Sequence, residues 1–142
     1  MKETKAALGG EMSGHIFFAD RYFGYDDAIY ASCRFVEILK KSGKKISELL
    51  SDLPVTFSTP EIRKECSEEK KFGIVEKAKK RFARDHEIID VDGVRILFGD
   101  GAWGLIRASN TQPVLVLRFE AKTQKRLDEI RSFVEGELEK LL

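Results

Sequence analysis

The second half of the sequence alternates one helical pattern, four short apolar runs and a second helical pattern. Residues 68–84 and 123–142 carry apolar side chains at the spacing of one helix face. The runs between them have the length and composition of strands. They cover residues 86–90, 94–98, 102–108 and 114–121. Short, Gly-containing connections favour an antiparallel meander, so we expect an α+β domain: a four-stranded antiparallel sheet with helices on one face.

The first part of the sequence holds too few elements to fold alone. Gly9–Gly10 is expected to open a turn, and Ile16–Ala19 reads as a short buried strand. A helix is expected to begin at Asp26 or Asp27 and to end near Gly43. One strand and one helix cannot bury each other's apolar surface. We therefore expect residues 1–53 to be the tail of a domain whose other strands are absent and residues 54–142 to form a separate domain.

Composition excludes several classes of protein. The 25 basic and 24 acidic residues leave a net charge of +1, whereas a nucleic-acid-binding protein usually has a basic excess. The lysines of residues 68–84 are interspersed with glutamates, which favours a solvated helix face. No apolar run approaches the roughly 20 residues of a membrane span, and the N-terminus lacks a signal-peptide pattern. We expect a cytoplasmic protein that binds neither nucleic acid nor membrane.

The segment between the third and fourth apolar runs, Arg107 to Pro113, is rich in hydrogen-bonding groups. Arg107 offers a planar guanidinium fork that matches phosphate oxygens, and the polar residues Ser109, Asn110 and Thr111 add further partners. Backbone amides of a tight turn can converge on the same anion. A plain polar hairpin loop accounts for these residues equally well, so residue chemistry alone leaves both interpretations open.

A second polar segment, Gly9 to His15, places Glu11 and Ser13 between glycines. A carboxylate and a hydroxyl two residues apart can reach neighbouring hydroxyls of a sugar, and His15 titrates near neutral pH and can move a proton. A Gly-rich turn that merely enters a strand is the alternative, because such loops are weak signals on their own.

Two separated stretches together resemble a known family, the α-D-phosphohexomutases. The first stretch, residues 10–18 (GEMSGHIFF), is similar to the family's sugar-binding loop, and residues 21–30 continue the similarity. The second consists of Asp92-Gly93-Val94-Arg95 and residues 103–121. Met12 and Asn110 resemble the phosphomannomutase/phosphoglucomutase branch, because phosphoglucosamine mutases tend to carry Gln at the Met12 position and a Ser-Gly-Thr phosphate loop.

The resemblance implies a fold and a place within a longer enzyme. Members have three α/β domains followed by a smaller α+β domain similar to the TATA-binding-protein fold. Residues 1–53 would be the end of domain three and residues 54–142 the C-terminal phosphate-binding domain. The preceding domains of the same enzyme would then be partners of this chain.

The resemblance also implies an activity. The family moves a phosphoryl group between C1 and C6 of a hexose phosphate through a phosphoserine, with Mg²⁺ held by an Asp-rich loop; this chain shows neither motif. Glu11, Ser13 and His15 would contact the sugar, with His15 as a possible proton-transfer group. Arg107, Ser109, Asn110 and Thr111 would hold the phosphate that is not transferred. We expect no metal ligands here and no turnover by the chain itself.

Other interpretations stay open at this point. The chain can be a stand-alone phosphate-recognition module that ignores Glu11, or a piece of a phosphoglucosamine mutase. Self-association through the helix at residues 28–39 is a further hypothesis.

Overall fold

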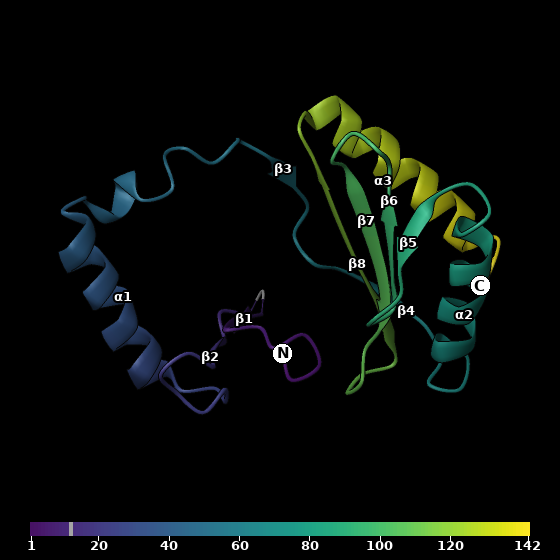
Figure 1. Cartoon of the computed structure of the whole chain (residues 1–142). Helices are drawn as coiled ribbons and strands as arrows, with labels where there is room; N and C mark the ends of the chain where they lie inside the picture. Colours follow the sequence, from purple (N-terminus) through teal and green to yellow (C-terminus); the bar gives the residue numbers. More distant parts are fainter. Residues whose placement is uncertain (12) are drawn as a thin grey trace. The chain divides into compact units, whose positions relative to one another are not determined.

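The computed structural model describes residues 1–11 and 13–142 and divides them into two compact units. The first unit is Met1–Leu53 and the second is Pro54–Leu142 (Figure 1). Each unit is described by itself below.

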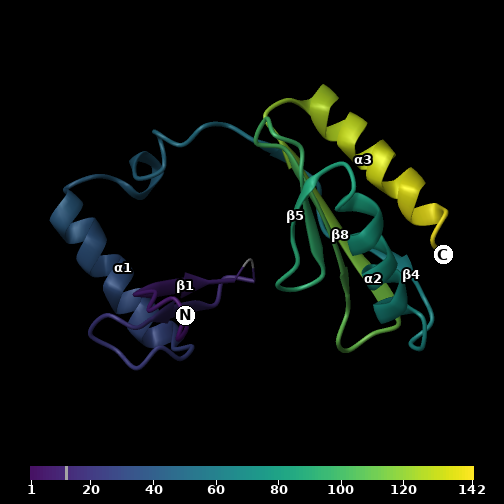
Figure 2. The ribbon, with the colours of Figure 1, turned by 45° about the vertical axis from the view of Figure 1, so that its right-hand side comes forward.

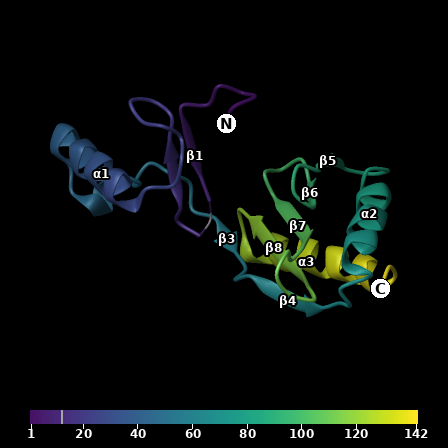
Figure 3. The same ribbon diagram turned by 90° about the horizontal axis from the view of Figure 1, so that it is seen from below.

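The first unit is a small hairpin next to one long helix. Strands β1 (Leu8–Gly10) and β2 (Ile16–Phe18) pair antiparallel, with Gly10 opposite Ile16, and α1 (Ala28–Ser42) follows (Figure 3). A short 3-10 turn, η1 (Ile46–Glu48), comes after it. The strand and the helix expected from the sequence are present, but the strand is not buried as expected: Ile16 is 40% exposed. Gly9 and Gly10 belong to β1, and the turn that they were expected to open begins after Gly10.

Helix α1 has well-formed ends but no buried residue. Asp27 caps its N-terminus by accepting a hydrogen bond from the Tyr30 N–H, and Gly43 ends it in the left-handed conformation. The apolar side of the helix stays open: Ile29 is 81% exposed and Val36 61%. Tyr30 of this helix packs against Phe18 and Tyr22, but the side of the helix that carries Ile29 and Val36 stays exposed in the first unit.

The second unit is built on one antiparallel sheet with the strand order β3-β8-β7-β6-β5; β4 also pairs with β8. The elements in chain order are β3 (Phe57–Ser58), β4 (Ile62–Glu65), α2 (Lys71–Phe82), β5 (Glu87–Ile89), β6 (Val94–Leu97), β7 (Trp103–Ala108), β8 (Val114–Ala121) and α3 (Gln124–Glu139). The α+β fold with an antiparallel sheet is confirmed. The sheet has six strands, however, and not the four expected.

The two additional strands are interrupted edge segments, which explains why the sequence did not predict them. Both pair with β8, and Pro60 lies between them, where it has no N–H to donate. Buried Thr59 bridges the break, because its N–H donates to the Phe119 carbonyl (3.0 Å) and its hydroxyl accepts from the Phe119 N–H (3.1 Å). β4 reads Ile-Arg-Lys-Glu, a polar composition typical of an edge strand.

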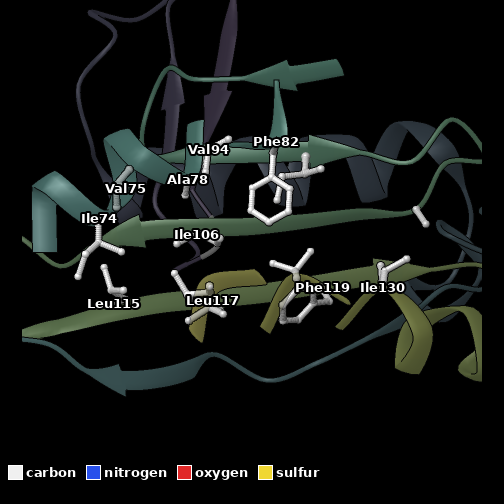
Figure 4. Packing of buried hydrophobic residues seen from close by; sticks show 14 of the residues in the cluster. Ile74, Val75, Ala78, Phe82, Val94, Ile106, Leu115, Leu117, Phe119 and Ile130 are labelled. Carbon is white, nitrogen blue, oxygen red and sulfur yellow. The ribbon is translucent and has the colours of Figure 1, made fainter. Parts of the chain in front are cut away.

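Helices α2 and α3 cover the same face of this sheet (Figure 2). Ala78 and Phe82 of α2, Ile106 of β7 and Ile130 of α3 belong to one buried cluster (Figure 4). Phe82 and Phe119 are fully buried. This single core fixes the ends of β7 and β8, and the loop between those two strands carries the second candidate site.

The inward face of α2 does not follow hydrophobicity at its start. Phe72, at a position of the helical apolar pattern, is 54% exposed, whereas the neighbouring Lys71 is buried. The buried ammonium of Lys71 has polar partners, described below, that offset its loss of hydration. Of the helices that the structure describes, none has both the length and the apolar character needed to cross a membrane.

Candidate functional site

The loop between β1 and β2 holds the first group of candidate residues. The Glu11 N–H donates to the His15 carbonyl (2.9 Å), and the Gly14 N–H donates to the Glu11 carbonyl (3.0 Å). Gly14 has φ +91°, a conformation that L-residues with a side chain rarely adopt. The loop backbone is thus fixed by its own hydrogen bonds. Met12, on which part of the branch distinction rests, lies outside the described residues.

The structure joins the two side chains expected to contact sugar hydroxyls. The Ser13 hydroxyl donates to Glu11 Oε2 at 2.9 Å, and both side chains are exposed. In this arrangement the second Glu11 oxygen and the Ser13 lone pairs remain available as acceptors. The pair can therefore accept hydrogen bonds from two neighbouring hydroxyl groups.

His15 forms a dyad with Asp26, a residue whose place in the sequence suggested only a helix cap. His15 Nδ1 lies 2.5 Å from Asp26 Oδ2, and backbone pairing of Asp26 with Phe17 of β2 brings the two side chains together. The hydrogen bond and the negative charge of Asp26 raise the pKa of His15 above its ordinary value of 6.5. With Nδ1 engaged, Nε2 is the nitrogen that can give or take a proton outside the dyad.

Asp27, rather than Asp26, caps helix α1, which leaves Asp26 free for His15. The second Asp27 oxygen accepts from the Tyr22 hydroxyl at 2.5 Å, and this bond lowers the pKa of Asp27. The Tyr22 ring stacks on Tyr30 with 3.8 Å between ring centroids. Two adjacent aspartates thus have separate tasks, one structural and one at the histidine.

We predict that Asp26→Asn lowers the pKa of His15 toward 6.5, because the substitution removes both the carboxylate charge and its hydrogen bond. An NMR titration of the imidazole Cε1 proton measures this, with His86 of the other unit as an internal control. Because the pKa of His15 is higher in the folded than in the unfolded chain, the pair contributes its full stabilisation at pH values below the pKa of the unfolded chain. This stabilisation is lost as the pH rises through the pKa of the folded chain. An unchanged His15 titration in Asp26→Asn would show that the dyad does not exist in solution.

The loop between β7 and β8 holds the second group, and Ser109 organises it from inside. The Ser109 N–H donates to the Val114 carbonyl (3.0 Å) and closes the loop. The Ser109 hydroxyl accepts from the N–H groups of Thr111 (3.3 Å) and Gln112 (3.2 Å). This pattern is a serine turn. Ser109 therefore fixes the loop, while Asn110 and Thr111 are exposed at its tip.

Arg107 is the next-to-last residue of β7 and lies at the entrance of this loop. Its NH1 donates to Asp92 Oδ2 at 3.2 Å, and the two side chains are 40% and 68% exposed. An exposed pair of this kind contributes little to stability, so an incoming dianion can compete with Asp92 for the guanidinium. The expected phosphate-binding residues Arg107, Ser109, Asn110 and Thr111 thus lie in one short, internally bonded segment.

Three contacts that the sequence did not suggest hold the exit of the loop. The Cys66 N–H donates to the Pro113 carbonyl (2.9 Å). Arg63 NH1 donates to the Gln112 side-chain oxygen (2.7 Å), and Lys71 Nζ donates to the Gln112 backbone carbonyl (3.2 Å). Residues 63–71 read as a charged, amphipathic stretch, and only the pairing of β4 with β8 brings them to the loop.

Magnesium has no fitting set of ligands in the described part of the chain. Among residues 1–11 and 13–142, no three His, Cys, Asp or Glu side chains converge on one point. Asp100, in the Gly-Asp-Gly turn, accepts from the Ala102 N–H (3.0 Å) and from Arg126 Nε (2.8 Å), and these bonds lower the pKa of its carboxyl group. Its carboxylate is part of the turn, so no step of a reaction is assigned to a metal here.

Two basic residues of α2, Lys79 and Arg81, form ion pairs within the chain. Lys79 pairs with Glu76 (2.8 Å), and Arg81 pairs with Asp85 and Glu137 (2.7 Å each). Phosphate contacts on a nucleic acid need lysine and arginine groups that point away from the protein. These pairings do not favour a nucleic-acid interface on this helix.

Comparison with known proteins places both units. A family model described as phosphoglucomutase/phosphomannomutase, C-terminal domain, matches residues 61–137, and that for the alpha/beta/alpha domain III of the same family matches residues 1–57. The chain belongs to the phosphoglucomutase/phosphomannomutase family. The family resemblance found in the sequence is thereby confirmed, and so is the correspondence of the chain to domain III and the C-terminal domain.

Curated members of the family are similar over nearly the whole chain. A phosphomannomutase/phosphoglucomutase of Pseudomonas aeruginosa is 48% identical over 140 residues, which are 97% of this chain and 30% of that protein. A phosphoglucomutase of Neisseria gonorrhoeae is 48% identical over 135 residues (93% and 29%), and a phosphoglucomutase/phosphomannomutase of Thermococcus kodakarensis is 34% identical over 127 residues (89% and 27%). The chain thus spans about three tenths of the length of these relatives.

Solved structures give the same assignment. A phosphoglucomutase/phosphomannomutase family protein from Burkholderia thailandensis superposes with a TM-score of 0.82 at 39% identity, covering 99% of this chain and 29% of that one. A Paramecium phosphoglucomutase, parafusin, has a TM-score of 0.60 at 18% identity over 99% of this chain and 31% of its own, and it supports the fold alone.

Proposed function

We propose that this chain supplies the sugar-contacting loop and the phosphate-gripping loop of a phosphomannomutase/phosphoglucomutase, an isomerase that moves a phosphoryl group between C1 and C6 of a hexose phosphate. The observation that carries the proposal is the loop that follows Arg107. A guanidinium stands beside a short turn that is already closed by its own serine and by backbone hydrogen bonds. A preformed turn loses little conformational entropy on binding an anion.

The second unit would hold the phosphate that is not transferred. Arg107 would give two parallel hydrogen bonds to phosphate oxygens, and Asn110 and Thr111 would add donors from the loop tip. Ser109 would act mainly by holding the loop in shape, because its hydroxyl oxygen already accepts two amides. Binding energy gained at this distant phosphate would position the sugar for the reaction elsewhere.

The first unit would hold the sugar. Glu11 and Ser13 would accept hydrogen bonds from two neighbouring hydroxyls, and their mutual hydrogen bond keeps them close together. His15 would exchange a proton through Nε2, with Asp26 stabilising its protonated form. A sugar that presents its hydroxyls in two orientations can use the same acceptor pair in both.

Other parts of the reaction would lie outside this chain. The phosphoserine and the Mg²⁺ ligands would come from preceding domains of the same enzyme, and we expect the chain itself to bind substrate weakly without turnover. The open apolar face of α1, with Ile29 and Val36 exposed, is the surface that further α/β structure would cover.

An NMR titration of the ¹⁵N-labelled chain tests the proposal. Glucose 1-phosphate, mannose 1-phosphate and inorganic phosphate should each give saturable amide shifts at residues 107–112, and the two sugar phosphates should add shifts at Glu11, Ser13 and His15. The turn at Gly99–Gly101 serves as an internal control. Absence of shifts at residues 107–112 at millimolar ligand would overturn the phosphate assignment for this chain.

The same titration separates the second candidate, a module that recognises phosphate alone. The observation that favours this candidate is that hydrogen bonds within the second unit close the loop at residues 107–113. It predicts that Glu11→Ala leaves the affinity for glucose 1-phosphate unchanged, whereas the sugar-contact proposal predicts a loss. Tighter binding of glucosamine 1-phosphate than of the two hexose phosphates would favour the phosphoglucosamine mutase alternative.

A further inference from the structure

Lys71 is a fully buried lysine next to the candidate phosphate loop. Its side chain is 0% exposed, although it is the first residue of α2 and is followed by the exposed Phe72. Burying an ammonium group is costly unless it finds charged and hydrogen-bonding partners. A buried lysine at the start of a helix therefore needs a specific reason to be there.

The partners of Lys71 connect helix α2 to the exit of the loop. Nζ lies 2.6 Å from Glu68 Oε1 and donates to the Gln112 carbonyl at 3.2 Å. Glu68 is 64% exposed, so its carboxylate remains hydrated while it balances the buried charge. Of these two contacts, the hydrogen bond to the Gln112 carbonyl is the one that joins Lys71 to the loop.

The Gln112 carbonyl lies at the pivot of the loop. It also accepts the Val114 N–H at 2.8 Å, which forms a tight turn around Pro113. The Gln112 N–H, on the same residue, donates to the Ser109 hydroxyl. Rotation of the peptide after Gln112 would break both bonds to its carbonyl, and the Gln112 N–H links the same residue to Ser109.

We propose that Lys71 is a positioning residue of the phosphate loop: its ammonium holds the Gln112 carbonyl and thereby keeps the turn at residues 109–112 in its binding conformation. The inference rests on the proposed function in taking phosphate as the ligand of this loop. Lys71 itself does not touch the ligand. Lys71 keeps the loop ordered before the ligand binds, and this order raises the affinity of the loop for phosphate.

The chain offers a matched control on the same helix. Lys79 pairs with Glu76, three residues before it, just as Lys71 pairs with Glu68, and its Nζ–Oε1 distance is 2.8 Å. Lys79→Met and Lys71→Met remove the same charge from α2, but only the second removes the bond to the loop. Glu68→Gln removes the carboxylate and leaves the Lys71–Gln112 bond in place.

The test compares these three variants with the wild-type chain by amide hydrogen exchange and by titration with inorganic phosphate. Lys71→Met should speed exchange at Ser109, Thr111 and Gln112 and raise the Kd for phosphate about tenfold, while Lys79→Met and Glu68→Gln change neither. Met has a similar unbranched shape, and the Gln112 carbonyl keeps its Val114 partner, so the sheet is expected to fold. Unchanged exchange and affinity in Lys71→Met, or equal losses in Lys79→Met, would overturn the proposal.

Two further readouts keep the outcome decisive. If the wild-type chain does not bind phosphate, the proposed function fails for this chain, and the exchange rates at residues 109–112 alone decide whether Lys71 positions the loop. If Lys71→Met unfolds the second unit, the ammonium ¹⁵N resonance of Lys71 is followed in the wild type. It should shift on phosphate binding while that of Lys79 does not, and a shift of neither would count against the inference.

Discussion

Gly93→Ala is expected to destabilise the second unit by about 3 kcal/mol or more. Gly93 has φ +79°, and a Cβ built on it would lie 2.6 Å from Arg107 Cβ and 2.8 Å from Arg107 Cα, with the Ile106 carbonyl oxygen closer still. The obstacle is backbone in the middle of the sheet, which cannot move away as a flexible side chain can. The penalty combines strain in φ with a collision between the turn that precedes β6 and the backbone of β7.

Urea unfolding followed by Trp103 fluorescence measures this effect in the right unit, because Trp103 is the single tryptophan and begins β7. Gly73→Ala is the matched control. Gly73 lies within helix α2 with open space around it, so alanine there should stabilise the unit by about 0.5–1 kcal/mol. Equal midpoints for the two variants would contradict the close contact between Gly93 and Arg107.

Gly93 also bears on the candidate site. It lets the turn after β5 approach the backbone of Arg107, and the preceding residue, Asp92, provides the carboxylate that holds the guanidinium. The Asp-Gly pair thus does more than close a hairpin. It places a competing anion next to the proposed phosphate-binding arginine.

Much of the fold follows from periodicity that the sequence shows directly. The helices around Ala78 and Ile130 repeat apolar residues at helical spacing, and β7 alternates buried and half-buried positions along Trp103–Ala108. These patterns depend only on local geometry. The loop after Arg107 was predictable for the same reason, because the whole segment is contiguous in sequence.

The features that escaped prediction depend on pairing partners that composition does not reveal. β4 reads as polar because it is an edge strand, and β1 contains two glycines, so neither has a strand-like composition. Lys71 and Asp26 reach their sites only through long-range contacts, one to Gln112 and one to His15. A charged residue in a helical pattern is normally assigned to solvent, and only the tertiary structure shows that Lys71 is buried.

Arg107→Ala is expected to raise the Kd of the chain for inorganic phosphate about 10- to 100-fold, since a charge-assisted hydrogen bond to an anion contributes roughly 1.5–3 kcal/mol. Arg107→Lys should restore only part of the affinity, because an ammonium lacks the planar fork. Arg126→Ala is the matched control: Arg126 has similar exposure and also pairs with an aspartate, Asp100, but lies away from the loop. Amide shifts in an NMR titration give the three affinities.

Asp92→Asn tests whether phosphate competes with the Asp92 carboxylate for the Arg107 guanidinium. The Asp92 carboxylate occupies Arg107 NH1 in the free chain and repels an incoming phosphate, so its neutralisation should tighten phosphate binding, by up to about fivefold for an exposed pair. The same substitution in an Arg107→Ala background should have much less effect, because the competition no longer exists. If Asp92→Asn weakens binding instead, the carboxylate orients Arg107 for the ligand rather than competing for it, and Arg107 would then bind phosphate without leaving Asp92.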